Sequence, residues 1–327
     1  ALGDLNGAET ALRQAMAIYP AANLFLLLAS NLHKQQRFVE ARDILASVLL
    51  LQPDLWMAHF NLAQVSLAEG NLRAALPELV FCLMRQPDNT ELLFQLATVH
   101  CQLDQPLDAK RYLESLLSLS PHHVEALNNY GVCHLKAEDY AAAIHCFATA
   151  MRVDDQHLPS RSNLAVTLLK ECRYQEALVH FDEYLKLAPL DAEANYNAGV
   201  AALLLANLDQ AATYFLNVLS TGHASVQSLL NLAAIALKKD EPSNAIGFYQ
   251  RALSLEPDQP IATYMVAALM GNVRPDKAPA AYVTALFDQY AAHFDQHLLM
   301  GLDYQTPQKL RALYAQITKA PCQSCVP

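Results

Sequence analysis

The chain repeats a pattern every 34 residues, and this period constrains its fold more than any other feature. Five prolines lie at multiples of 34 from one another, at positions 53, 87, 121, 189 and 257. Alanine stands twelve residues before each of seven equivalent slots: Ala41, Ala75, Ala109, Ala143, Ala177, Ala211 and Ala245. Twenty-four residues before the same slots the residue is always small: Ala29, Ala63, Ala97, Gly131, Ala165, Gly199 and Ala233. Each unit carries two apolar-periodic stretches of about thirteen residues, which predicts a helical hairpin that must stack on its neighbours.

Composition supports an ordered, helix-rich chain. Hydrophobic residues make up 53% of the 327 residues and only 9 residues are glycine, a balance that disordered chains do not have. Charged residues reach 17%, below the usual quarter, so we expect part of the surface to be covered by a partner or by more protein.

Charge and hydropathy exclude several classes of partner. The formal net charge of −10 disfavours nucleic acid and anionic membranes. No apolar run is long enough to cross a bilayer, and the N-terminal "ALGDLNGAET" lacks the basic and apolar regions of a signal peptide. We therefore predict a cytoplasmic protein without a membrane segment.

The cysteines do not form a recognisable metal or catalytic pattern. Five of them are scattered through helical stretches and are interpreted as small buried apolar residues: Cys82, Cys101, Cys133, Cys146 and Cys172. The terminal pair Cys322 and Cys325 has zinc or redox spacing, but no second pair completes four ligands. We predict no metal site.

The period and its two small-residue columns resemble the tetratricopeptide repeat. The resemblance covers about residues 3–257 and implies an all-α, right-handed superhelix of helical hairpins whose first helices line a concave groove. It divides the chain into the second helix of a partial repeat (1–20), seven repeats (21–257), a capping helix with a linker (258–278) and a non-repeat segment (279–327). We expect further repeats before residue 1.

A polar amide recurs two residues before each small position of six consecutive repeats: Asn61, Gln95, Asn129, Asn163, Asn197 and Asn231. The resemblance implies that these side chains point into the groove. An amide both donates and accepts, so the row could hold an extended peptide backbone of any sequence. The alternative is that the amides bond within their own hairpins.

The same resemblance assigns an apolar floor to the groove. It consists of a leucine column, with aromatic side chains nearby: Leu67, Leu135, Leu169, Leu203 and Leu237, then Phe60, Phe94 and Tyr196. These residues could bind an apolar peptide segment, or they could simply pack between repeats. Glutamates such as Glu91 and Glu125 stand where chaperone-binding repeats carry lysine, so acidic tails of heat-shock chaperones are disfavoured partners.

The stretch "YVTALFDQYAAHFDQHL" does not continue the 34-residue pattern of the repeats. It predicts an amphipathic helix over about 280–299, and "YQTPQKLRALY" predicts a second helix after it. His293 and His297 lie one turn apart, but no third ligand stands near them. Residues 260–318 resemble the junction between tetratricopeptide repeats and an S-adenosylmethionine-dependent methyltransferase domain in bacterial proteins. This resemblance implies that Phe287, Tyr290 and Phe294 lie beside a cofactor cleft.

The glycine-rich turn that would bind this cofactor is missing, since the chain contains no G-x-G. We therefore expect no cofactor and no catalysis in the chain as given, with S-adenosylmethionine bound only by a complete methyltransferase domain beyond residue 327. The sequence predicts a protein- or peptide-binding scaffold, the recognition region of such an enzyme. The alternative is a free-standing adaptor for assembly of a protein complex.

Overall fold

The computed structural model describes residues 4–222 and 225–271, together with residues 280, 283 and 284. Structural statements below concern these residues alone. Most of the predicted helix over 280–299, including Phe287, Tyr290 and Phe294, lies outside the described residues, as do the whole of the second predicted helix and Cys322 and Cys325.

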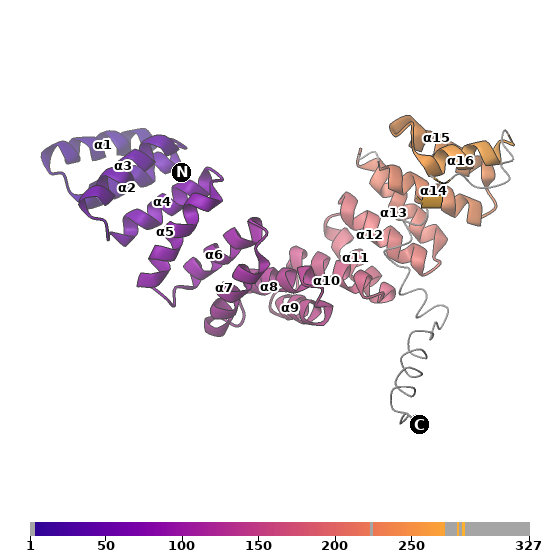
Figure 1. The fold of residues 1–327 in the computed structure, drawn as a ribbon, viewed down its shortest axis with the longest axis horizontal. Helices are drawn as coiled ribbons and strands as arrows, with labels where there is room; N and C mark the ends of the chain where they lie inside the picture. Colours follow the sequence, from indigo (N-terminus) through magenta and orange to yellow (C-terminus); the bar gives the residue numbers. More distant parts are fainter. Residues whose placement is uncertain (1–3, 223–224, 272–279, 281–282, 285–327) are drawn as a thin grey trace, which may run out of the picture. The chain divides into compact units, whose positions relative to one another are not determined.

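All regular structure in the described part of the chain is α-helical, which confirms the predicted all-α class (Figure 1). The helices are α1 (Leu5–Ile18), α2 (Ala22–Lys34), α3 (Phe38–Leu51), α4 (Trp56–Ala68), α5 (Leu72–Arg85), α6 (Thr90–Gln102), α7 (Pro106–Leu119), α8 (Val124–Lys136), α9 (Tyr140–Val153), α10 (Leu158–Lys170), α11 (Tyr174–Leu187), α12 (Ala192–Leu204), α13 (Leu208–Ser220), α14 (Val226–Lys238), α15 (Pro242–Leu255) and α16 (Pro260–Leu269).

The described residues divide into two compact units, and each is treated by itself. The first comprises the described residues up to 189 together with 200–206, and the second comprises 190–199 and the described residues from 207. In the first unit, α2 packs on α3 and α4 on α5, and the same pairing continues to α10 on α11. In the same unit α3 packs on α4, α5 on α6, α7 on α8 and α9 on α10, so the hairpins from α4 to α9 bury their apolar faces on two sides.

The small-residue columns lie at the closest helix contacts. All seven alanines of the second-helix column have no exposed surface, and the small residues of the first-helix column are buried. Large side chains between the hairpins are buried as well: Leu45, Leu79, Leu113, Phe147, Phe181, Phe215 and Tyr249. The burial of these columns confirms the predicted hairpin packing, in which a missing side chain on one helix makes room for a large one.

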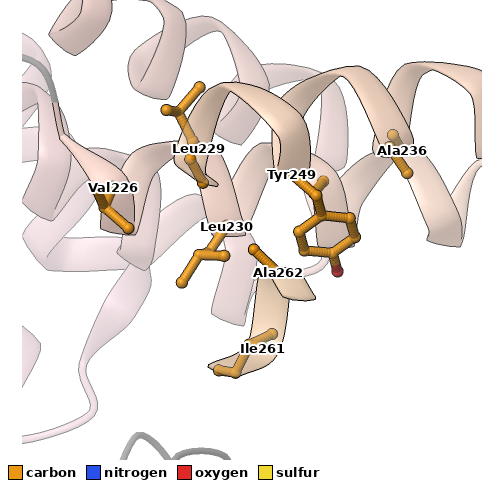
Figure 2. Close-up of a cluster of buried hydrophobic side chains, with 10 residues drawn as sticks. Val226, Leu229, Leu230, Ala236, Tyr249, Ile261 and Ala262 are labelled. Carbon is orange, nitrogen blue, oxygen red and sulfur yellow. The ribbon is translucent and has the colours of Figure 1, made fainter. Parts of the chain in front are cut away.

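The second unit shows the same packing at the C-terminal end of the repeats. Leu229 and Leu230 of α14, Tyr249 of α15, and Ile261 and Ala262 of α16 belong to one buried cluster (Figure 2). Helix α16 packs on α15 and thereby covers an apolar face that would otherwise meet water.

The turn inside each hairpin adds a column that the sequence pattern did not reveal. One residue per repeat adopts a left-handed conformation, with φ between 55° and 74°: Gln36, Gly70, Asp104, Glu138, Cys172, Ala206 and Asp240. The next residue donates its N–H to a carbonyl five positions earlier, as from Asn71 to Ser66 at 2.8 Å. This is the Schellman geometry of a helix C-terminus, which favours glycine, yet only Gly70 is one.

We expect Gly70→Ala to lower the free energy of unfolding by about 1 kcal/mol, because an L-residue is strained at this φ. A Cβ at Gly70 would meet no atom within 4 Å, so the backbone conformation alone sets the cost. The reverse change, Ala206→Gly, should raise the free energy of unfolding by about 0.5–1 kcal/mol. Urea denaturation followed by circular dichroism measures both; the same sign for both changes would contradict the assignment.

Candidate functional site

Three consecutive first helices of the first unit, α2, α4 and α6, enclose a recess of about 420 Å³. Its lining consists of Leu26, Leu27, Ser30, Trp56, Met57, Phe60, Asn61, Asn89, Glu91 and Leu92. The recess therefore lies on the side of the hairpins where the repeat resemblance implies a groove, and it includes Phe60 and Asn61 from the predicted site.

The walls of the recess are mostly apolar, and part of them faces solvent. Leu26 and Leu92 are buried at its base, whereas Leu27 is 55% exposed and Met57 is 44% exposed. Trp56, the only tryptophan of the chain, also lines the recess. Exposed apolar side chains gathered in a concavity are typical of a binding site, since they lose water when a ligand covers them.

The polar groups of the recess differ in what they can still bind. Asn89 caps α6 by accepting from Leu92 N–H at 3.2 Å and also donates to Gln86 at 2.7 Å. Glu91, the only charged residue of the lining, is exposed. The side chain of Asn61 has no hydrogen-bond partner among the described residues, so its amide can still donate and accept.

Gln95, the next member of the amide row, is held between two neighbours. Gln64 of α4 donates to its carbonyl oxygen at 2.8 Å, and its own amide nitrogen donates to Glu91 at 2.8 Å. Gln95 therefore links two adjacent first helices and positions the carboxylate of Glu91 at the rim of the recess.

Asn163 belongs to a similar bridge between α8 and α10, which reaches α8 at Asn128, next to Asn129. Asn163 donates to the side chain of Asn128 at 2.9 Å, and Asn128 in turn donates to Asn129 at 3.4 Å. Ser160, which is fully buried, also donates to Asn128 at 3.2 Å. Asn163 therefore bonds between repeats, whereas the bond to Asn129 comes from its neighbour in α8, and part of the hydrogen-bonding capacity of both amides is already used.

The other amides of the row are only partly accessible. Asn197 is half-buried and Asn231 is buried, and neither side chain has a hydrogen-bond partner within the described segments. A continuous ladder that grips peptide backbone stays a prediction.

The predicted apolar floor is partly occupied by packing inside the protein. Leu135, Leu169 and Leu203 are all half-buried. Phe94 lies against His123 with ring centroids 5.0 Å apart, and Tyr196 meets the ring of Phe215 edge-on at 5.7 Å. These contacts leave each side chain only partly available to a partner.

Eight of the ten lining residues were absent from the predicted site, among them the apolar Leu26, Leu27, Trp56 and Met57. The repeat register contains a signal for three of these four. Adding 34 to Leu26 and Leu27 leads to Phe60 and Asn61, and adding 34 to Met57 leads to Glu91. Equivalent positions of successive first helices therefore meet in one recess. Trp56 stands at the first position of α4, where no regular column marks it.

The described residues contain no cluster of three His, Cys, Asp or Glu side chains placed to share a metal ion. In the same part of the chain, no helix combines the length and apolar character needed to span a bilayer.

Three protein-family models match segments of the chain. Two describe the tetratricopeptide repeat and match residues 163–223 and 228–262. The third describes subunit 3 of the anaphase-promoting complex, or cyclosome, and matches residues 108–184. No curated protein matches the chain in the comparison made.

Solved structures share the fold at low sequence identity. A tetratricopeptide repeat protein from Parabacteroides merdae is 17% identical, with 76% of this chain and 98% of that chain covered and a TM-score of 0.56. PilF from Pseudomonas aeruginosa is 18% identical, covers 67% of this chain and 97% of its own, and has a TM-score of 0.54. YrrB, a tetratricopeptide repeat protein with an unusual peptide-binding site, is 18% identical, with 60% and 98% covered and a TM-score of 0.52.

Proposed function

With the fold of a tetratricopeptide repeat protein as the premise, we propose that the chain is a protein- or peptide-binding scaffold. Its recess between α2, α4 and α6 holds a bulky apolar side chain of an extended partner segment. The observation that carries the proposal is the combination of exposed Leu27 and Met57 with the unpaired amide of Asn61 in one concavity. The apolar walls would take the side chain while the amide bonds the partner's backbone.

The charge of the rim favours a basic residue beside the apolar one. Glu91 is the only charged lining residue, and Glu125 is the exposed residue at the equivalent position of the next repeat. The chain as a whole carries a formal net charge of −10. A partner segment with Lys or Arg next to its apolar side chain would complement this field, whereas an acidic one would be repelled.

Short synthetic peptides that differ at one apolar and one charged position test this proposal, with the emission of Trp56 as the readout. We expect a peptide with Phe beside Lys to shift the emission on binding. Replacing that Phe with Ser should weaken binding about 10- to 100-fold, because burial of a large apolar side chain contributes about 1.5–3 kcal/mol. In the protein, Leu27→Lys should weaken binding at least about tenfold, since it places a charge in the apolar wall.

A charge reversal and a matched surface variant complete the test. Glu91→Lys should exchange the preference, so that a peptide with Glu beside Phe binds about three- to tenfold better than one with Lys. Leu107→Ser, at a residue 78% exposed on α7 and outside the recess, should leave every affinity unchanged. Binding that is indifferent to Leu27→Lys, or Trp56 emission that no bound peptide alters, would reject the recess as the site.

The scaffold could belong to either of two kinds of protein, an enzyme with an attached catalytic domain or a free-standing adaptor, and one experiment distinguishes them. The resemblance of residues 260–318 to a methyltransferase junction favours a recognition region that delivers partners to an attached methyltransferase. A free-standing adaptor fits the repeats equally well, and the anaphase-promoting complex model over 108–184 describes a component of a multiprotein assembly. Reading the gene beyond codon 327 separates the two: a strand followed by a glycine-rich turn supports the enzyme, and an immediate stop codon supports the adaptor.

A further inference from the structure

Two cysteines from adjacent repeats meet in the first unit. The sulfur atoms of Cys101, near the end of α6, and Cys133, in α8, lie 4.0 Å apart. Cys101 stands at the position that leucine occupies in the floor column, for example Leu67 and Leu135. In the repeats on either side, the residue pairs equivalent to these two cysteines are Leu67 with Val99 and Leu135 with Thr167.

We propose that Cys101 and Cys133 are a reversible oxidation site, at which a hydroperoxide converts the two thiols into a disulfide between α6 and α8. A disulfide has an S–S length of about 2.05 Å, so the sulfurs must approach by about 2 Å. The two residues lie on neighbouring first helices, so closing this gap requires a change of side-chain rotamer or a small shift of one helix. A covalent link here would join the third and fourth hairpins.

The two thiols differ in solvent exposure and in pKa, and these differences indicate which of them reacts first with the oxidant. Cys101 is half-buried and reaches solvent, whereas Cys133 is buried. The hydrogen bond shared with Cys133, together with the nearby ammonium of Lys136, lowers the pKa of the Cys101 thiol to about 7 despite partial burial. The same contact raises the pKa of Cys133. Cys101 is therefore the thiolate that meets an oxidant from solvent, and Cys133 remains a thiol beside it.

The chemistry then needs two steps and one oxidant. The Cys101 thiolate attacks the terminal oxygen of the hydroperoxide, its O–O bond breaks, and the leaving alkoxide takes a proton to become an alcohol. The resulting sulfenic acid is attacked by Cys133; the S–S bond forms, and the hydroxyl leaves with the Cys133 proton as water. Two thiols are oxidised, and one hydroperoxide is reduced to an alcohol and water.

Other cysteines of the chain serve as internal references. Burial raises the pKa of Cys82 and of Cys146 to about 11, so both stay protonated at neutral pH. The experiment uses the full chain with Cys322→Ser and Cys325→Ser, because those two residues could form a disulfide of their own. The probe is hydrogen peroxide, followed by non-reducing peptide mapping by mass spectrometry.

We expect one cross-linked pair of peptides, containing Cys101 and Cys133 and lacking two hydrogens, which dithiothreitol releases. Cys101 should react with iodoacetamide at least about tenfold faster than Cys82 or Cys146, as its larger thiolate fraction requires. Cys133→Ser should abolish the cross-link and leave a Cys101 sulfenic acid that dimedone traps, whereas Cys146→Ser should change nothing. Hydrogen exchange in α6 and α8 should slow on oxidation and recover on reduction.

Several results would overturn the site. Free Cys133 together with sulfinic acid at Cys101 would show that the sulfurs cannot meet. A cross-link between different molecules, or equal reactivity of Cys101 and Cys82, would remove the basis of the assignment. Serine is close to cysteine in size, so Cys133→Ser and Cys146→Ser should leave the circular dichroism spectrum unchanged. A variant that loses its helical signal would count against a pair whose effect is confined to the contact between α6 and α8.

Discussion

Phe147→Ala should lower the free energy of unfolding by about 3–5 kcal/mol, the usual cost of removing a buried aromatic ring. Phe147 lies on α9 with no exposed surface, and its ring packs directly against Gly131 of α8. Alanine would leave a void at this contact, because the two helix backbones are held apart by their other side chains. Urea denaturation monitored by circular dichroism measures the loss.

The matched control for this change lies on the same helix. Val153 is 44% exposed at the last position of α9, so Val153→Ala should change the free energy of unfolding by less than about 0.5 kcal/mol. Because each repeat contacts only its neighbours, hydrogen exchange should accelerate mainly in α8, α9 and α10. A loss no larger than that of the control would mean that Phe147 does not support the stacking of the hairpins.

Gly131→Ala should also destabilise the protein, although alanine is the better helix former. A Cβ at this position would lie 2.6 Å from Cε1 and 2.8 Å from Cζ of Phe147, well inside ordinary contact distance. Overpacking of this kind costs about 1–3 kcal/mol, and the gain from removing a helical glycine, about 0.5–1 kcal/mol, offsets only part of it.

Gly247, inside α15, provides the matched control, because a Cβ built there has no atom within 4 Å. Gly247→Ala should therefore stabilise the protein by about 0.5–1 kcal/mol.

A second substitution at Phe147 tests whether contact with its ring is the reason that Gly131→Ala destabilises the protein while Gly247→Ala stabilises it. Alanine faces leucine at the same two positions of the first three repeats, as in Ala97 with Leu113. Adding Phe147→Leu to Gly131→Ala should therefore cost less than the sum of the two single changes, with a coupling of about 0.5–3 kcal/mol in the double-mutant cycle. Strict additivity, or stabilisation by Gly131→Ala alone, would show that the ring is not confined by the glycine.

The candidate site was predictable only in part. The register of the repeats placed Phe60 and Asn61 on the groove side of a first helix, and both line the recess. It did not separate Asn61, whose amide has no hydrogen-bond partner in the described residues, from Gln95, which bonds to Gln64 and Glu91. The two amides share one position in the repeat, so the pattern treats them alike, but Gln64 comes from a variable position of the neighbouring helix α4.

The sequence by itself determined the class and the architecture of the repeats. A 34-residue period with two small-residue columns predicts a stack of helical hairpins. Each hairpin carries small side chains on one face and large ones on another, and it can bury both faces only against neighbouring hairpins. The tertiary structure decided where the recess lies, which turn residue takes a positive φ, and that Cys101 meets Cys133. The positive φ is set by local hydrogen bonds at the end of each first helix, whereas the recess and the cysteine pair depend on contacts between residues one or two repeats apart. Those contacts depend on how side chains fill the space between helices. A residue's place in the repeat specifies its helix face, whereas the neighbouring repeat specifies what it touches.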